Sequence, residues 1–236
     1  MSAALGIMCK APHPGRTKTR LAAFLGAERA ARLSGCFLKD VAQAVLAVPD
    51  ALGSQGYGVY APAGSEAELE EILPPSFRLL LQDGNDFGLV LGSAVQRLLG
   101  EAGHDCVVLI NSDSPTLPVA LLTTAITALR RPGDRVVLGP AIDGGYTLIG
   151  LKRDHPELFA EIPWSTGEVL RLTLERAAGI ALAVEMLPLW YDIDDLETFR
   201  VLQAEVAGTP PAFAPPGLIG GPAKETRAML AEWPEP

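Results

Sequence analysis

Short apolar runs alternate along most of the chain with longer segments whose apolar residues recur at helical spacing. The clearest run, residues 107–110, is wholly apolar and leads directly into a polar stretch, residues 111–114. A short apolar run bounded by turn residues predicts a strand that is buried on both faces. Similar runs predict the remaining strands, and the full set covers residues 3–8, 56–61, 77–82, 106–111, 135–141, 146–151 and 181–187.

Between these runs, residues 27–48 place Ala30, Leu33, Phe37 and Val41 on one face of an amphipathic helix. Further helices are expected from near residue 17, over 66–73, from Asp86 to residue 99, over 119–129, and after residue 168. Their expected caps are Ser65 in a capping box with Glu68, Asp86, and either Ser165 or Thr166. Alternating strands and helices predict an α/β, doubly wound, mostly parallel sheet, and residues 146–151 form its one antiparallel strand.

The composition changes after Gly208, because seven of the 20 prolines lie beyond it. We therefore expect a main domain over residues 1–208 and a Pro/Gly-rich arm over 209–236, wrapped on the surface or partly mobile. One helix is expected within the arm, near residues 224–233. A chain of 236 residues with 48% hydrophobic content can bury one full core.

The net charge of −9 argues against a nucleic-acid partner. The three cysteines are widely spaced and indicate neither a disulfide framework nor a zinc site. No apolar run approaches the roughly 20 residues that span a bilayer, and the first ten residues lack a basic leader. A cytoplasmic protein without a membrane span is expected.

Charged residues cluster where predicted strands end. Asp113 follows the strand over 106–111, at the place where open α/β sheets bind ligands. It could hold a divalent cation beneath a phosphate or cap the next helix. After the first strand, Lys10, Arg16, Lys18 and Arg20 surround a Pro-Gly loop, which indicates either an anion site or a solvated basic loop. A Walker A motif is absent from the sequence.

Two more acidic stretches belong to the same predicted sheet edge. Asp143 precedes two glycines and is either a turn residue or part of a site. Asp192 and Asp194 alternate in an extended segment, so they point the same way and could supply further carboxylates for a metal at Asp113. One acid of the run that ends at Asp195 is expected to cap the following helix.

Five sequence blocks now support a resemblance: KAPHPGRTKTRL, NSDSPTLP, GPAIDGGYTLIGL, PWST and YDIDDLETF. They resemble the motifs of a bacterial glycosyltransferase family with the GT-A, nucleotide-diphosphosugar transferase-like fold. Its members are often named for selenodomain or arsenosugar gene neighbourhoods (DUF2064-like). The resemblance covers about residues 5–202. The family commonly has D-L-G-E-R after its third strand, whereas this chain has Leu89 and Val90 in place of the acid and the arginine, and Asn111 replaces a glycine.

The resemblance implies a role for each matching residue. Phosphate or nucleotide binding would fall to Lys10, Gly15, Lys18, Arg20 and Gln82. A divalent metal, Mg²⁺ or Mn²⁺, would be held by Asp113, Asp192 and Asp194. Asp143 would act as the base toward the acceptor hydroxyl or help with the metal. The acceptor side would comprise Gly144, Gly145, Tyr146, Trp164, Ser165 and Thr166.

The activity that the resemblance implies is metal-dependent transfer from a nucleotide-sugar to a small-molecule acceptor, with a homodimer as one assembly. The alternative is a nucleotidyltransferase, similar to the 2-phospholactate and molybdenum-cofactor guanylyltransferases, that uses a nucleoside triphosphate and a phosphorylated small molecule and releases pyrophosphate. A non-catalytic nucleotide-binding module is a third interpretation, which the missing Glu-Arg pair favours.

Overall fold

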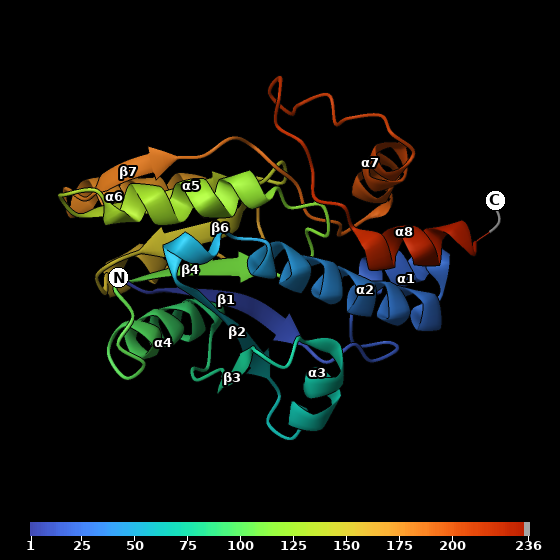
Figure 1. Ribbon diagram of the computed structural model, residues 1–236, viewed down its shortest axis with the longest axis horizontal. Coiled ribbons are helices and arrows are strands. Elements are labelled where there is room, and N and C mark those ends of the chain that lie inside the picture. Colours follow the sequence, from blue (N-terminus) through green and yellow to red (C-terminus); the bar gives the residue numbers. More distant parts are fainter. Residues whose placement is uncertain (234–236) are drawn as a thin grey trace.

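The computed structural model describes residues 1–233 and is built around one seven-stranded sheet (Figure 1). The strand order is β3-β2-β1-β4-β6-β5-β7. The strands are β1 (Ala3–Lys10), β2 (Ser54–Ala61), β3 (Arg78–Leu81), β4 (Cys106–Asn111), β5 (Arg135–Pro140), β6 (Tyr146–Leu151) and β7 (Ala183–Met186). β6 runs antiparallel to both neighbours, β4 and β5, and the other pairs are parallel. The sequence-based prediction of a mostly parallel, doubly wound sheet is confirmed.

Helices cover both faces of this sheet (Figure 1). They are α1 (Thr19–Leu25), α2 (Ala27–Leu46), α3 (Glu66–Ile72), α4 (Phe87–Leu99), α5 (Val119–Arg130), α6 (Val169–Gly179), α7 (Leu196–Val206) and α8 (Lys224–Ala231), with 3₁₀ turns η1 (Asp50–Leu52) and η2 (Pro156–Phe159). The core on one face includes α2 and α5, and the core on the other includes α4 and part of α6.

The central strand β4 shows why the sheet needs two covered faces. Val108 and Ile110 belong to the core cluster on one side, and Val107 and Leu109 belong to the cluster on the other. Side chains of a strand alternate between faces, so an unbroken apolar run is stable only where both faces are covered. The strand predicted from this run has the observed bounds, Cys106–Asn111.

The segment 209–223 has no helix or strand, and it leads into α8, which packs on α2. Asp40 of α2 accepts hydrogen bonds from the backbone amides of Glu225 and Thr226, at 3.0 and 2.9 Å. Asp40 therefore caps α8 from another element and ties the end of the chain to the body. Residues 234–236 of the predicted arm lie outside the described part of the chain. Within residues 1–233, no helix combines the length and apolar character needed to cross a membrane.

Two predicted caps are wrong, and two are confirmed. The hydroxyl of Ser65 donates to the carbonyl of Pro62 instead of accepting from α3. Neither Ser165 nor Thr166 caps α6, because the helix starts at Val169, four and three residues later, and the hydroxyl of Thr166 donates to the carbonyl of Pro163. Asp86 and Asp195 do cap α4 and α7. Short hydroxyl side chains have several nearby carbonyls to choose from, which makes their capping hard to predict.

Candidate functional site

The candidate site lies at the carboxyl ends of β1 and β4, the two central parallel strands. The loop between β5 and β6 and the segment after β7 reach the same edge, because β5 and β7 run parallel to each other. The segment after β7 is fixed there by a hydrogen bond from the amide of Ile193 to the carbonyl of Asp113, at 3.0 Å. The three acidic stretches that the sequence places at one sheet edge are therefore brought together.

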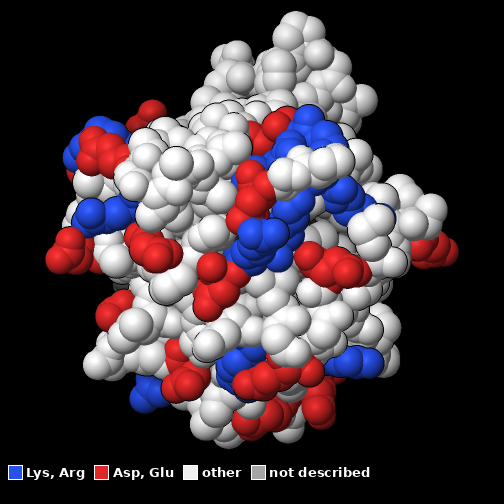
Figure 2. All heavy atoms as spheres, turned by 90° about the vertical axis from the view of Figure 1, so that its left-hand side faces the viewer, with Lys and Arg blue, Asp and Glu red and all other residues white. Residues whose placement is uncertain are grey.

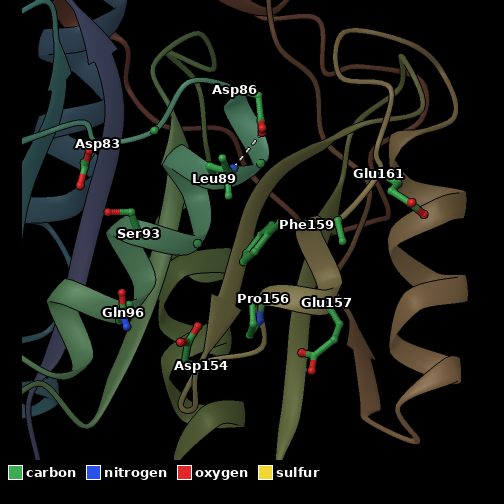
Figure 3. A pocket seen from close by; sticks show the side chains of 14 residues that line it. Asp83, Asp86, Leu89, Ser93, Gln96, Asp154, Pro156, Glu157, Phe159 and Glu161 are labelled. Carbon is green, nitrogen blue, oxygen red and sulfur yellow. Dashed lines mark hydrogen bonds between the residues drawn. The ribbon is translucent and has the colours of Figure 1, made fainter.

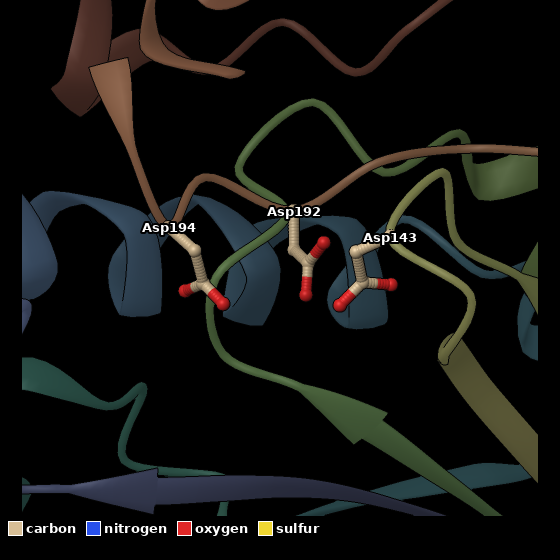
Figure 4. A group of neighbouring side chains, drawn as sticks. All are labelled: Asp143, Asp192 and Asp194. Carbon is tan, nitrogen blue, oxygen red and sulfur yellow. The ribbon is translucent and has the colours of Figure 1, made fainter. Parts of the chain in front are cut away.

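Asp143, Asp192 and Asp194 form the centre of the site, which we call the acid trio. One carboxylate oxygen from each lies within 4.8 Å of the others (Figure 4). Asp143 is exposed, and its Oδ1 accepts a hydrogen bond from the amide of Gly145 at 2.8 Å. The turn requires glycine at Gly144, where φ is +87° and an added Cβ would lie 2.3 Å from the carbonyl oxygen of Gly167.

The electrostatic surroundings of Asp192 disfavour its ionised form. Burial, followed by the charges of Asp143 and Asp194, raises the pKa of its carboxyl to about 7. Among residues 1–233, the one side chain that donates a hydrogen bond to it is Asn111, whose Nδ2 lies 3.4 Å from Asp192 Oδ2. Like charges held this close are stable as carboxylates only when a cation or a proton compensates them.

Lys18 supplies part of that compensation. Its Nζ lies 2.9 Å from Asp113 Oδ2 and 2.6 Å from Asp194 Oδ1, and its side chain is 6% exposed. Burial alone would lower the pKa of Lys18, but the charges of Asp113 and Asp194 raise it above the usual value. Lys18 also has φ +48°, a strained backbone conformation for a residue with a side chain. Lys18 therefore joins Asp113, in the loop after β4, to the acid trio.

This arrangement differs in composition from the expected metal ligands. The sequence reasoning grouped Asp113 with Asp192 and Asp194, whereas the acid trio contains Asp143 in place of Asp113. Asp113 is instead half-buried in its ion pair with Lys18. Asp143 lies beside the other two acids and also lines the second cavity described below, so its position suits both roles considered for it, base and metal ligand.

A network behind the trio was missed by the sequence reasoning. The hydroxyl of Ser114 donates to the carbonyl of Tyr191 at 2.8 Å, and the hydroxyl of Thr116 lies 3.4 Å from that of Tyr191. The fully buried Tyr191 donates in turn to Glu205 of α7. These contacts join the loop after β4 to the segment that carries Asp192. The available signal was an aromatic pair, Trp190 and Tyr191, directly before the acids.

One cavity of about 540 Å³ opens beside the trio and carries most of the predicted phosphate ligands. Its lining includes Lys10, Arg16, Arg20, Lys18 and Gln82. Lys10, Arg16 and Arg20 are exposed, whereas the Gln82 amide donates to the carbonyl of Val59 at 2.9 Å and so also braces β2. Gly15 lies in the same loop with φ +75° and open space around it.

A second cavity, of about 320 Å³, lies on the other side of the trio. It contains the predicted acceptor-side residues Gly145, Tyr146, Trp164, Ser165 and Thr166, while Gly144 forms the adjoining turn. The ring of Phe87 meets that of Trp164 edge-on, with centroids 5.2 Å apart. Burial raises the pKa of the Tyr146 hydroxyl, which keeps it neutral. The cavity therefore offers an apolar contact surface directly beside the carboxylates of the acid trio.

The residues present fit a divalent cation. Three carboxylates at one point form the hard oxygen donor set that Mg²⁺ and Mn²⁺ prefer. Asn111 Oδ1 adds a buried acceptor that has no hydrogen-bond partner among residues 1–233. A cation at the trio would relieve the repulsion that raises the pKa of Asp192.

Basic side chains also gather at the opposite pole, where β5 begins and β6 ends (Figure 2). There they lie among acidic groups: Arg131 is 2.6 Å from Glu185, and Arg153 is 3.8 Å from Asp134. His155 contacts the same Asp134 at 2.9 Å. Paired charges of this kind are typical of a solvated surface. The two cavities and the acid trio between them form one cleft, and its basic side, with the exposed Lys10, Arg16 and Arg20, is the better anion site.

Comparisons with known proteins agree with the fold. A crystal structure of a proposed nucleotide-diphospho-sugar transferase from Desulfovibrio desulfuricans G20 is 31% identical, with a TM-score of 0.83 over 98% of this chain and 95% of that one. A CMP:2-keto-3-deoxy-manno-octonic acid synthetase in complex with CTP matches at 12% identity and a TM-score of 0.57, over 87% of this chain and 99% of that one. The 4-diphosphocytidyl-2C-methyl-D-erythritol synthase of Anaerococcus prevotii DSM 20548 matches at 11% and 0.56, over 87% and 96%.

The latter two likenesses concern the fold alone. With the 31% identical structure, that fold is nucleotide-diphospho-sugar transferase-like. No curated protein sequence matches the chain. The model of a family described as "uncharacterized protein conserved in bacteria (DUF2064)" matches residues 45–166, more than half of the chain. That segment includes Asp113, Asp143 and the wall of the second cavity around Trp164. On the family match and the 31% identical structure together, the chain belongs to the DUF2064 family.

Proposed function

We propose that the protein is a metal-dependent transferase that moves a sugar from a nucleotide-sugar donor to a small-molecule acceptor. One observation carries the proposal: Asp113 and Asp194 line both cavities, so the acids stand between a basic cavity and an apolar one. A donor diphosphate suits the basic side and an acceptor suits the apolar side, which places the reacting bond beside the acids. The 31% identical structure, described as a proposed nucleotide-diphospho-sugar transferase, supports the same reaction class.

In this proposal, Asp192 and Asp194 would hold Mg²⁺ or Mn²⁺, with Asp143 beside them as the free acid of the trio. The cation would supply charge neutralisation at the diphosphate leaving group. Lys10 and Arg20 bind the phosphates from the basic cavity. Lys18 holds the carboxylates of Asp113 and Asp194 in position through its two ion pairs, and it supplies a fixed positive charge beside the leaving group. Fixed charges in a closed cleft stabilise developing negative charge without further reorganisation.

Asp143 is the proposed base because it is the exposed member of the trio and faces the acceptor cavity. It would take the proton of the acceptor hydroxyl while the acceptor oxygen bonds to the sugar and the nucleoside diphosphate departs. Asp143→Asn should then abolish transfer and leave nucleotide binding intact. Normal turnover in that variant would refute this role.

The first experiment is a thermal-shift screen of nucleotide-sugars and nucleoside di- and triphosphates, with and without Mn²⁺ or Mg²⁺. A ligand at one hundred times its dissociation constant adds about 2.7 kcal/mol to the free energy of unfolding. We expect a metal-dependent shift with one nucleotide-sugar that is lost in Asp194→Ala, a proposed metal ligand, and kept in Asp86→Asn, because Asp86 caps α4 outside the trio. A nucleotide that binds, with no turnover of any donor, would favour the non-catalytic nucleotide-binding module instead.

Nucleotidyl transfer is the second candidate, and the number of cations in the basic cavity favours it. Lys10, Arg16 and Arg20 are all exposed there, enough positive charge for a nucleoside triphosphate. The acceptor phosphate would then attack the α-phosphorus and displace pyrophosphate. The product separates the two reactions, since glycosyl transfer releases a nucleoside diphosphate and nucleotidyl transfer releases pyrophosphate.

A further inference from the structure

We propose that a groove between α4 and η2, separate from the cleft, binds a basic and partly apolar peptide segment of a partner protein. The groove has a volume of about 860 Å³. Figure 3 shows its floor of Leu89, Phe159 and Pro156, with carboxylates around the edge. None of the residues assigned to the proposed reaction lines it.

The floor is apolar and elongated. Leu89 is 55% exposed although it sits in the first turn of α4. Gly88, Gly92 and Gln96 line the groove at four-residue spacing, which follows the helix for roughly 12 Å. Glycine at position 88 lets the backbone of η2 approach α4 closely, since a Cβ on Gly88 would lie 2.5 Å from the carbonyl oxygen of Phe159. An open channel along a helix matches an extended or helical peptide better than a compact metabolite.

The rim is uniformly acidic. Its carboxylates come from Asp83, Asp86, Asp154, Glu157 and Glu161, and no Lys or Arg is among the 14 lining residues. Glu161 is paired with Arg176 at 2.9 Å, and Asp86 accepts from the Leu89 amide. Within residues 1–233, no ion pair satisfies Asp83, Asp154 or Glu157. Unpaired carboxylates around exposed apolar surface are complementary to cationic side chains that flank apolar ones.

The groove also shares a helix turn with the cleft. Phe87, next to Gly88, meets Trp164 in the apolar cavity, and Trp164 Nε1 would lie 3.1 Å from a Cβ on Gly88. A peptide in the groove therefore contacts the same turn of α4 that presents Phe87 to the cleft. The occupant is a peptide, because one segment can place apolar side chains on Leu89 and cations on both rims.

The test uses a labelled amphipathic peptide of lysine and leucine, with fluorescence anisotropy as the measure of binding. The matched probe replaces each lysine with glutamate. We expect the lysine peptide to bind and the glutamate peptide not to bind. The double variant D154N/E157Q and the single variant Leu89→Ser should each weaken binding by about tenfold or more. Equal binding of the two peptides, or no binding of either, would overturn the proposal.

A charge-matched control excludes general attraction to an acidic protein. The double variant E70Q/E71Q removes the same number of charges from α3, which lies outside the groove. It should leave the dissociation constant of the lysine peptide within about twofold of the wild-type value. An equal loss in this control would refute the groove as the site. Sedimentation of the protein alone tests the other occupant: a dimer that D154N/E157Q dissociates would show a second copy in the groove and overturn the peptide proposal.

Discussion

Asp192 and Asp195 are three residues apart and have opposite surroundings. Asp195 caps α7: its Oδ1 accepts from the amide of Thr198 at 2.9 Å, and this backbone hydrogen bond lowers the pKa of its carboxyl. Asp192 is turned toward Asp143 and Asp194, and burial together with their charges raises its pKa to about 7. The fold stabilises Asp195 as an anion, whereas it holds Asp192 in place against the repulsion of neighbouring carboxylates.

The difference separates structural from functional acids. A capping carboxylate satisfies an amide that would otherwise lack a partner, so it adds to stability. A carboxylate that repels its neighbours persists only because the surrounding contacts fix it, as Ser114 and Thr116 do through Tyr191. Strain of this kind is a mark of sites that await a cation or substrate.

The largest expected effect comes from removing one acid of the trio. Asp192→Asn should lower transfer by about 10²–10³-fold, because a charge that acts on the reacting groups is lost. Isothermal titration with Mn²⁺ should show weaker binding in the same variant. Asp195→Asn is the control, since asparagine caps a helix as well as aspartate does. Equal activity of Asp192→Asn and wild type would place the reaction elsewhere.

Much of the fold and of this site could be predicted from the sequence. The bounds of β4 and β6 match the prediction, because their apolar runs end at turn residues. The convergence of Asp113, Asp143 and Asp192 followed from their places after strands of one sheet. The ion pair between Lys18 and Asp194 could not be predicted, because it joins residues 176 positions apart through a strained backbone at Lys18.

The pH dependence of stability provides the next effect. The folded-state pKa of Asp192, about 7, lies above its unfolded value. Between the two values the folded protein binds more protons than the unfolded chain, so the contribution of Asp192 to stability falls as pH rises. Without divalent cations, wild type should lose on the order of 2 kcal/mol relative to Asp192→Asn between pH 4 and pH 8.

Urea unfolding at several pH values measures this difference. Mn²⁺ should reduce the loss in wild type at pH 8, because a bound cation compensates the carboxylates. A difference between wild type and Asp192→Asn that does not change with pH would contradict the electrostatic account of the trio.

Tyr191→Phe tests the network behind the acids. The variant removes the donor to the buried carboxyl of Glu205 and a partner of the Thr116 hydroxyl. Leaving such groups without a partner costs about 2 kcal/mol, measurable by urea unfolding with an unchanged m-value. Tyr60→Phe is the matched control, because its hydroxyl also donates to a glutamate, Glu66, in a less buried place. An equal loss in both variants would show that burial of the Tyr191 network adds nothing.

The smallest effect concerns the capping acid. Asp195→Ala leaves the amide of Thr198 without its side-chain acceptor at the start of α7, which should lower the free energy of unfolding by about 1 kcal/mol. Because the folded-state pKa of Asp195 is lowered, its contribution is present above the unfolded pKa and is lost as pH falls through the folded value. Stability of Asp195→Ala and wild type should therefore converge in acid, whereas wild type and Asp192→Asn should diverge as pH rises. If the stability of both variants relative to wild type changed with pH in the same direction, Asp192 and Asp195 would not have opposite electrostatic surroundings, and the distinction between a capping acid and a cleft acid would be refuted.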